Sequence, residues 1–324
     1  MDNILDKKWA YRELGQTGIG LSPLGLGSWQ FSRGKGAAIG VWGMLNQTKV
    51  NEIVLNSLAG GINWFDTAEA YGMGQSEESL AEALKQAGIR PGECFIATKW
   101  QPTMRSASSL KTLLPIREGF LSPYKVDLYQ VHFPGLFASI DAQMDNMAAL
   151  YKEGRIRAIG VSNFNASQMR IAQKRLNKYG LSLASNQVKY NLLDRQIETN
   201  GVLETARELG ISLIAYSPLA MGVLSGKYQR NPEYLEMVPF IRRKTIRRAL
   251  EKSMPVIAKL SEISARYNAD IAQVALAWVI YGQGDTVFAL AGASTPVQAR
   301  ENLRALDIKL TAAEIAELNS VSGS

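Results

Sequence analysis

Three short apolar runs of this chain end at ionisable side chains. I-N-W-F precedes Asp66 and the nearby Tyr71, C-F-I-A-T precedes Lys99, and D-L-Y-Q-V precedes His132. A phenol has a pKa near 10, but an adjacent ammonium stabilises the phenolate and lowers that pKa. Asp66 can keep Lys99 protonated, and His132 can hydrogen-bond a substrate oxygen or help the phenol exchange its proton. These groups can protonate a carbonyl oxygen during reduction, and they lack the nucleophile that a covalent mechanism needs.

Each of these side chains also has a structural interpretation. Asp66 can cap the helix that follows it, Tyr71 can pack on the rim of a loop, and a lone histidine is often structural. Lys99 is harder to explain in this way, because a buried ammonium is costly unless it is paired. His132 is the only histidine, which excludes a metal site built from several imidazoles. We favour the catalytic interpretation because all four residues fall at the ends of apolar runs, and we expect no metal.

The runs belong to a set of eight predicted strands, separated by segments with helical period. Strict alternation of strand and helix predicts a parallel sheet with right-handed crossovers. Polar residues at the end of every strand favour closure into a barrel, whose mouth lies at the carboxyl ends of its strands. We therefore predict an α/β protein with the (β/α)8 (TIM) barrel fold, as a single domain of residues 1–324. The predicted strands are Leu24–Trp29, Asn63–Thr67, Cys94–Lys99, Asp127–His132, Ile156–Ser162, Ser185–Lys189, Ser212–Ser217 and Val287–Ala293.

Other segments surround this alternating pattern. A β-hairpin is predicted at the N-terminus around Gly15–Gly18, and a C-terminal helix is predicted from the capping-box spacing of Thr311 and Glu314. Ser76 and the acids after it suit the start of a helix. A long irregular stretch is expected from residue 217 to about residue 245, and such loops are usually functional. The other helical patterns cover residues 50–61, 76–88, 141–153, 166–179, 198–209 and 271–280.

Composition narrows the class of protein. Hydrophobic residues make up 46% and charged residues 20% of the chain, as in an ordinary globular enzyme. No stretch approaches the roughly 20 apolar residues of a membrane helix, and the charged N-terminus lacks the apolar core of a secretory signal. Cys94 is the only cysteine, so no disulfide can form within the chain. We therefore expect a cytoplasmic protein without a membrane partner.

The net charge of +7 is spread along the whole chain, except for the cluster I-R-R-K-T-I-R-R at residues 241–248. One interpretation of this cluster is a solvated loop or helix start. Another is a patch that attracts the phosphates of a cofactor, because positive potential concentrates anionic ligands. Nucleic acid is a third possibility, but no recognition module is visible, and we expect no nucleic-acid partner. The oligomeric state stays open.

The remaining predicted strands end in neutral polar groups. Amides and hydroxyls can bind a carboxamide, and an aromatic ring can stack on a flat heterocycle, so Ser162, Asn163, Gln187, Tyr216 and Ser217 could hold a nicotinamide ring. Simple loop hydrogen bonding is the alternative for the amides. Aromatic residues with the loop 217–245 could line an apolar substrate pocket, or could pack on the rim of the barrel. These aromatic residues are Trp29, Trp100 and Phe133.

Several motifs in one order resemble the aldo-keto reductases. They are D-T-A-E-A-Y-G-M-G-Q-S-E, A-T-K-W, L-Y-Q-V-H-F-P, I-G-V-S-N-F, S-N-Q-V-K-Y-N, A-Y-S-P-L-A-M-G-V-L-S-G-K-Y and G-A-S-T-P-V-Q-A-R-E-N-L, from about residue 11 to residue 306. The resemblance implies reduction of an aldehyde or ketone by hydride from NADPH, with NADH the less favoured cofactor. It also implies a catalytic tetrad of Asp66, Tyr71, Lys99 and His132, with Tyr71 as proton donor. The chain looks most similar to microbial and plant chloroplast reductases, some of which act on pyridoxal.

The resemblance also implies the cofactor contacts. Ser162, Asn163 and Gln187 would hold the carboxamide, and Tyr216 would stack on the nicotinamide. Family members often place a cation after the last strand for the adenosine 2′-phosphate, whereas this chain has G-A-S-T there, followed by Arg300. Hydroxyls and helix amides can still bind phosphate, and Arg300 could reach it. The further predicted cofactor contacts are Gly27, Ser28, Trp29, Ser217, Pro218, Leu219, Gly222, Lys227, Gly292, Ser294, Thr295, Gln298, Glu301 and Asn302.

A redox-sensing or regulatory subunit is the alternative from another class of protein. The potassium-channel β subunits resemble this family and keep the tetrad, so the motifs also fit that role. The chain has no long N-terminal extension that could serve as a gating peptide, which favours the enzyme. A third possibility uses the same site for net dehydrogenation or a redox-neutral sugar reaction. Consumption of cofactor in steady state separates these alternatives.

Overall fold

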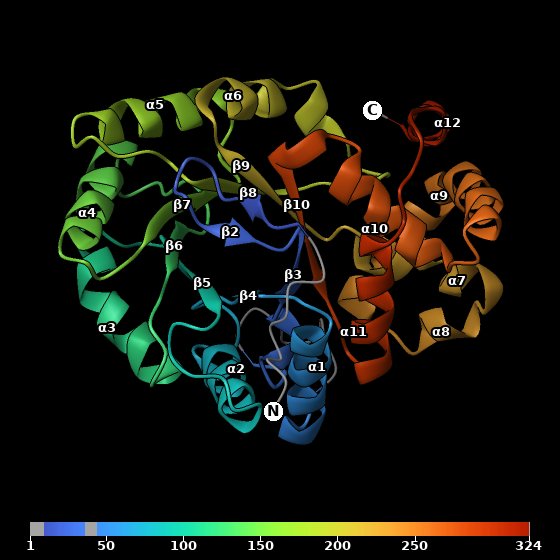
Figure 1. Ribbon diagram of the computed structural model, residues 1–324, viewed down its shortest axis with the longest axis horizontal. Helices are drawn as coiled ribbons and strands as arrows, with labels where there is room; N and C mark the ends of the chain where they lie inside the picture. The colour runs from blue at the N-terminus through green and yellow to red at the C-terminus, as the bar shows by residue number, and fades with distance from the viewer. Residues whose placement is uncertain (1–9, 36–43, 324) are drawn as a thin grey trace.

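Eight parallel strands form a closed barrel in the computed structural model, which describes residues 10–35 and 44–323 (Figure 1). The strand order around the barrel is β10-β3-β4-β5-β6-β7-β8-β9. The predicted (β/α)8 fold is confirmed, and each predicted strand lies within two residues of an observed one. The strands are β3 (Leu24–Gly27), β4 (Trp64–Asp66), β5 (Phe95–Trp100), β6 (Leu128–Val131), β7 (Ala158–Ser162), β8 (Ser185–Lys189), β9 (Ser212–Tyr216) and β10 (Val287–Gly292).

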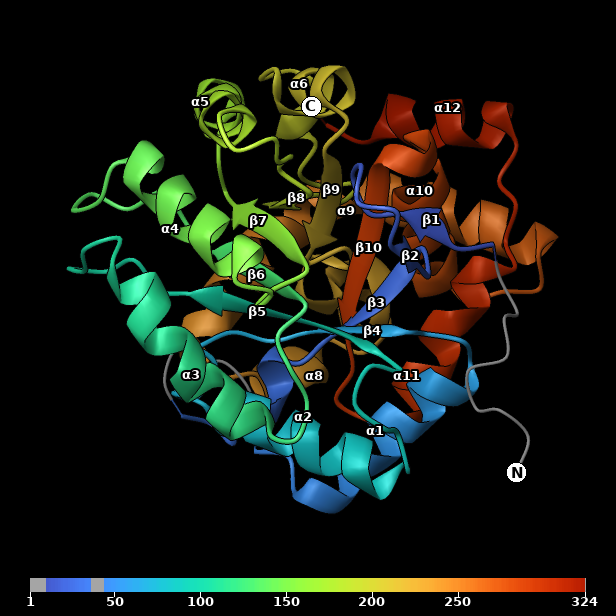
Figure 2. The ribbon, with the colours of Figure 1, turned by 60° about the vertical axis from the view of Figure 1, so that its left-hand side comes forward.

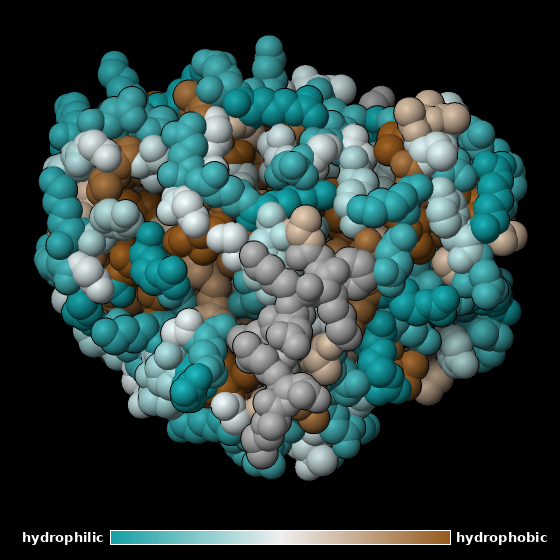
Figure 3. Space-filling view, in the orientation of Figure 1, coloured by the Kyte–Doolittle hydropathy of each residue, from teal (hydrophilic) through white to brown (hydrophobic). Residues whose placement is uncertain are grey.

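Helices surround the barrel as an outer layer (Figures 1 and 2). Buried apolar side chains of the strands and helices pack between the two layers. On the face that Figure 3 shows, most protruding side chains are hydrophilic, and the strongly apolar ones lie mainly in the gaps between them. The helices of eight or more residues are α1 (Gln47–Ala59), α2 (Gln75–Gln86), α3 (Ser109–Leu121), α4 (Ile140–Lys152), α5 (Ala166–Asn177), α6 (Val202–Leu209), α9 (Phe240–Arg266), α10 (Ile271–Tyr281), α11 (Pro296–Leu303) and α12 (Ala312–Val321).

The predicted N-terminal hairpin is present as β1 (Arg12–Glu13) and β2 (Gly20–Leu21), which pair antiparallel. Leu14 and Leu21 of this hairpin pack into the same buried cluster as Trp64 and Phe288 of the barrel strands. Only glycine fits at position 25, because a Cβ there would lie 2.2 Å from Cε2 of Trp64. This apolar packing fills the barrel interior next to the hairpin and leaves the polar chemistry to the carboxyl ends of the strands.

The helix predictions need two corrections. Ser76 does not cap α2: Gly74 occupies the cap position with φ 105°, and the Ser76 hydroxyl instead bonds the backbone oxygen of Ser28 at 2.7 Å. The stretch from residue 217 to 245 is not irregular either. It contains the 3-10 helix η3 (Ala220–Ser225), the short helices α7 (Lys227–Arg230) and α8 (Glu233–Glu236), and the start of α9. Left-handed residues at Ser217, Ala220 and Met221 break the helical period there, which explains why the pattern looked irregular.

The C-terminal helix is confirmed as α12, with a capping box in which Thr311 and Glu314 each bond the other's backbone. Helix α3 was not predicted. It contains Pro115 and Gly119, two residues with poor helix propensity that hid its apolar period. No helix in the described part of the chain is long and apolar enough to cross a membrane.

Candidate active site

Lys99 lies at the centre of the four predicted catalytic residues. Its ammonium nitrogen donates to Oδ2 of Asp66 at 2.5 Å and to the backbone oxygen of Thr67 at 2.9 Å. The same nitrogen lies 3.4 Å from the hydroxyl oxygen of Tyr71. Strands β4 and β5 are neighbours in the barrel, so residues far apart in the sequence meet at one edge. Asp66 and Lys99 are wholly buried, and this burial strengthens the attraction between them.

Burial and the charges of this pair together set the protonation of Lys99 and Tyr71. Burial alone would lower the pKa of Lys99, but Asp66 and Tyr71 outweigh it and hold the pKa above its ordinary value. Burial raises the pKa of the Tyr71 phenol, and the Lys99 ammonium offsets only part of this rise. From the sequence we predicted that the pKa of Tyr71 is lowered. The direction of that prediction was wrong, because it did not include the effect of burial. At neutral pH the phenol therefore carries the proton that it could donate.

Asp66 is held by two side-chain amides through its second carboxylate oxygen. Oδ1 accepts from Nε2 of Gln187 at 2.9 Å and from Nε2 of Gln130 at 3.0 Å. Sequence reasoning assigned Gln187 to the cofactor and missed Gln130 altogether. The sequence does contain a signal for Gln130, which is the single amide inside the apolar run L-Y-Q-V. A buried polar side chain needs a hydrogen-bond partner, so this amide pointed to a polar contact inside the barrel.

Tyr71 and its loop are fixed from two sides. The Tyr71 ring stacks on Trp29, with ring centroids 5.8 Å apart. Two residues earlier, the Glu69 carboxylate accepts from Nη1 of Arg105 at 2.6 Å and from the backbone N–H of Gln101 at 3.1 Å. These bonds tie the loop after β4 to the loop after β5. The sequence did not point to Glu69 or Arg105, because their partners lie more than thirty residues away in the chain.

His132 lies edge-on to the Tyr71 ring, with ring centroids 5.9 Å apart at 82°. Burial, and then repulsion from Lys99, lower the pKa of His132 to about 3. The imidazole is therefore neutral at physiological pH. It can orient a substrate oxygen through a neutral hydrogen bond, but it does not supply a proton as an imidazolium.

The state of His132 can be tested because the chain contains no other histidine. In untagged protein, the imidazole NMR resonances should stay in the neutral form down to about pH 4. Between pH 6.5 and 3 the unfolded chain binds a proton that the folded chain does not, so the free energy of unfolding should fall as the pH falls through this window. A titration midpoint near 6.5 would show that burial and the Lys99 charge do not lower the pKa of His132.

A cavity of about 1090 Å³ opens beside the tetrad. This volume is slightly above the roughly 300–1,000 Å³ of small-molecule sites, which suits a dinucleotide together with a small substrate. Lys99 lies beneath the cavity wall, whereas the other three tetrad residues line it. The predicted cofactor residues that line it are Gly27, Trp29, Ser162, Asn163, Gln187, Tyr216, Ser217, Pro218, Leu219, Gly222, Lys227, Gly292, Ser294, Gln298, Glu301 and Asn302.

Besides Lys99, four predicted site residues do not line this cavity. The Ser28 hydroxyl is buried and bonds the backbone oxygen of Asp66, and Thr295 caps α11 through the backbone of Gln298. Phe133 is half-buried against His132, outside the cavity lining. Trp100 is wholly buried in the core, where its indole N–H donates to Ser109 of α3. Side chains alternate along a strand, so Trp100 points outward toward the helices because Lys99 before it points inward.

Part of the cavity lining consists of the groups expected to hold a nicotinamide. The Tyr216 hydroxyl donates to Oδ1 of Asn163 at 3.0 Å, and Nδ2 of Asn163 donates to the backbone oxygen of His132 at 3.2 Å. Asn163 has φ 59°, a left-handed conformation that asparagine tolerates better than most residues. The Ser162 hydroxyl donates to the backbone of Gln187 at 2.8 Å. These bonds connect the strand ends of β7, β8 and β9 into one polar wall.

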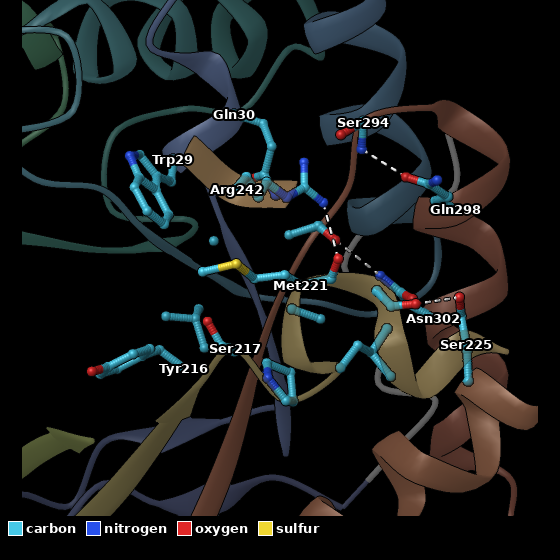
Figure 4. Close-up of a pocket in the computed structure, with 18 of the residues that line it drawn as sticks. Trp29, Gln30, Tyr216, Ser217, Met221, Ser225, Arg242, Ser294, Gln298 and Asn302 are labelled. Carbon is cyan, nitrogen blue, oxygen red and sulfur yellow. Dashed lines mark hydrogen bonds between the residues drawn. The ribbon is translucent and has the colours of Figure 1, made fainter. Parts of the chain in front are cut away.

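Cations also line the cavity. Lys227, Arg230 and Arg242 line it, and Nη2 of Arg242 donates to the backbone oxygen of Met221 at 2.9 Å (Figure 4). Burial, and then Arg242, lower the pKa of Lys227. Arg242 is the member of the 241–248 cluster that enters the cavity, which supports the phosphate interpretation of that residue.

The arginine after the last strand points elsewhere. Nη1 of Arg300 donates to Oδ1 of Asn56 on α1 at 3.1 Å, and Arg300 does not line the cavity. On the same segment, Oε1 of Gln298 accepts from the backbone N–H of Ser294 at 2.9 Å (Figure 4). The possibility that Arg300 reaches a cofactor phosphate is therefore not supported by this arrangement.

The sequence and structure resemble known proteins over nearly their whole length. The aldo/keto reductase family matches residues 23–322. An uncharacterised oxidoreductase of Mycobacterium tuberculosis is 35% identical over 302 residues, covering 91% of this chain and 88% of that protein. The NADH-specific methylglyoxal reductase of Escherichia coli is 33% identical over 327 residues, covering 93% and 94%. The crystal structure of the thermostable aldo-keto reductase Tm1743 with epalrestat has a TM-score of 0.76 and 31% identity, covering 96% and 99%.

With its closed eight-stranded barrel and these similarities, the chain belongs to the aldo-keto reductase family. It is an NAD(P)H-dependent oxidoreductase, and the reaction of its family is the reduction of carbonyl groups.

Proposed function

We propose that this chain reduces a small aldehyde or ketone with hydride from NADPH, and that Tyr71 is the general acid. The observation that carries this proposal is the ammonium of Lys99, which lies between Asp66 and the Tyr71 hydroxyl. As the carbonyl oxygen gains negative charge, the phenol can pass it a proton, and Lys99 stabilises the phenolate that is left. His132, being neutral, can hold the carbonyl oxygen beside Tyr71.

The residues of the cavity fit a nicotinamide dinucleotide. Asn163 and Gln187 offer amide donors and acceptors for a carboxamide, and Tyr216 offers an aromatic face. At Gly222 an added Cβ would lie 3.1 Å from Cε of Lys227, so glycine leaves that ammonium room in the cavity. When it is bound, the reduced nicotinamide supplies the hydride. The protein residues bind and orient the reactants, and Tyr71 supplies the proton.

The cations of the cavity support NADPH as the preferred cofactor, because its extra phosphate adds negative charge. The similarity to a reductase named as NADH-specific makes NADH the competing choice. Steady-state oxidation of each cofactor should be followed by absorbance with methylglyoxal, pyridoxal, simple aldehydes, ketones and sugars. Rapid turnover with NADPH supports the proposal. Tightly held cofactor with negligible turnover would favour the sensor instead.

Arg242→Gln tests the phosphate contact. A hydrogen bond to a charged group is worth about 1.5–3 kcal/mol, so we expect kcat/KM for NADPH to fall roughly 10- to 100-fold. The value for NADH should fall less, because NADH lacks the 2′-phosphate. Arg300→Gln is the matched control, since that arginine is bonded to Asn56 outside the cavity. Equal losses with both cofactors, or a wild-type preference for NADH, would contradict this assignment.

A further inference from the structure

Gln130 is a buried amide beneath the tetrad that the proposed mechanism does not use. It lies on β6, opposite Lys99 of β5 in the register of the barrel, and its side chain is wholly buried. It does not line the cavity, so neither the cofactor nor the substrate would touch it there. Its Nε2 donates to Oδ1 of Asp66 at 3.0 Å, on the side opposite the bond to Lys99.

The two amides on Oδ1 differ in what else they can bind. Gln187 lines the cavity, so its amide could bind a ligand there as well as Asp66. Gln130 is enclosed in the barrel and has no such second role. It is therefore the amide that can hold the Asp66 carboxylate in one orientation whether or not the cavity is filled. That orientation directs Oδ2 at the ammonium of Lys99.

The barrel accommodates the Gln130 side chain next to a glycine, although one of its polar atoms is left unpaired. Gly160 of β7 is the register partner of Gln130, and a Cβ at Gly160 would lie 2.8 Å from Cγ of Gln130. Oε1 of Gln130 is buried without a hydrogen-bond partner among the residues that the structure describes. An unpaired buried oxygen is unfavourable, and an apolar side chain of similar size would avoid it. The bond from Nε2 to Asp66 is the contact that offsets this cost.

We propose that Gln130 is a positioning residue for the reduction: it orients Asp66, so that Asp66 holds Lys99 charged beside Tyr71. This inference rests on the proposed role of Tyr71. Its consequence is that the Tyr71–Lys99 pair should respond to a change at position 130, although that side chain touches neither reactant.

Gln130→Met is the first test, because methionine has a similar length and no donor. We expect kcat to fall roughly 10- to 100-fold, the range for loss of a hydrogen bond to a charged group. KM for the substrate and Kd for NADPH should stay within about twofold of wild type, since no ligand contact is lost. The alkaline limb of the kcat profile should move to lower pH, because a less firmly held carboxylate stabilises the ammonium less.

Ser185→Ala is the matched control. Ser185 is wholly buried on β8, and its Oγ would lie 2.7 Å from a Cβ at Gly160, on the same side as Gln130. Its hydroxyl is another buried group without a partner in the described residues, and no bond joins it to Asp66. This variant should keep the wild-type kcat and pH profile. Comparison of the two variants by thermal unfolding separates a general loss of packing from a change in the tetrad.

Gln130→Glu is a second test, and it does not depend on whether the fold accepts methionine at position 130. A protonated glutamic acid can donate to Asp66, whereas a carboxylate would repel it, so activity should be retained at low pH and lost as the pH rises. Wild-type kcat and pH profiles in both variants would overturn the inference. A loss in Gln130→Met that Ser185→Ala reproduces would also overturn it. If Tyr71→Phe proved active, the proposed function itself would fail, whatever position 130 does.

Discussion

Replacement of Tyr71 by phenylalanine should lower kcat for carbonyl reduction by about a thousandfold. General acid catalysis typically contributes 10²- to 10⁴-fold, and the variant loses the only phenol that lies beside the Lys99 ammonium in the described residues. The affinity for NADPH should remain within about twofold of wild type, because phenylalanine keeps the ring that stacks on Trp29. Cofactor binding by fluorescence titration and turnover by NADPH absorbance measure the two quantities separately.

Tyr216→Phe is the matched control for this experiment. Tyr216 is a second phenol that lines the same cavity, but its hydroxyl donates to Asn163 and not to the tetrad. Loss of that hydroxyl should weaken cofactor binding more than it lowers kcat. If Tyr71→Phe keeps wild-type turnover, or if the two variants lose kcat equally, Tyr71 is not the proton donor.

The pKa of Tyr71 bears on the pH dependence of the same reaction. Because burial holds the phenol above its ordinary pKa, the proton should remain available throughout the neutral range. As the proposed proton donor, Tyr71 therefore need not be half-ionised to act. A phenol is a stronger acid than the alcohol product, and Lys99 stabilises the phenolate once the proton has left.

The barrel and the positions of the tetrad could be predicted because both depend on local signals. Short apolar runs mark the strands, and a parallel barrel brings their carboxyl ends to one face. Lys99 was informative for this reason, since an ammonium at the end of a buried strand needs a partner near that face. Trp100 was assigned wrongly although the information was present. It follows Lys99 in the same strand, and alternation places the two side chains on opposite faces.

The parts of the site that could not be predicted depend on contacts distant in sequence. Arg242 lies on α9, in a segment whose left-handed turns at Ala220 and Met221 no periodicity reveals. The packing of α9 on η3 decides which arginine of the 241–248 cluster enters the cavity. Arg242 bonds Met221 of η3, whereas Arg243 and Arg247 form ion pairs with Glu236. The direction of the Tyr71 pKa shift could not be predicted from the sequence either, because it depends on how deeply the fold buries the ring.

Replacement of Lys99 by methionine should lower kcat by a similar order, about 10²- to 10⁴-fold, through a different cause. The phenol would remain, but without the ammonium its phenolate would no longer be stabilised and its pKa would rise further. The variant should also lose stability, because Asp66 would be left as a buried carboxylate without its cation. Breaking a buried ion pair in this way typically costs about 3–5 kcal/mol.

A double variant, Asp66→Asn with Lys99→Met, separates the two effects. Asparagine removes the unpaired charge and can still accept from Gln130 and Gln187, so urea unfolding should show that much of the lost stability returns. Turnover should not return, because the phenol still lacks its cation. Recovery of turnover together with stability would mean that Lys99 supports the fold alone. Loss of turnover in a restored fold would identify the ammonium as the group that makes proton donation by Tyr71 effective.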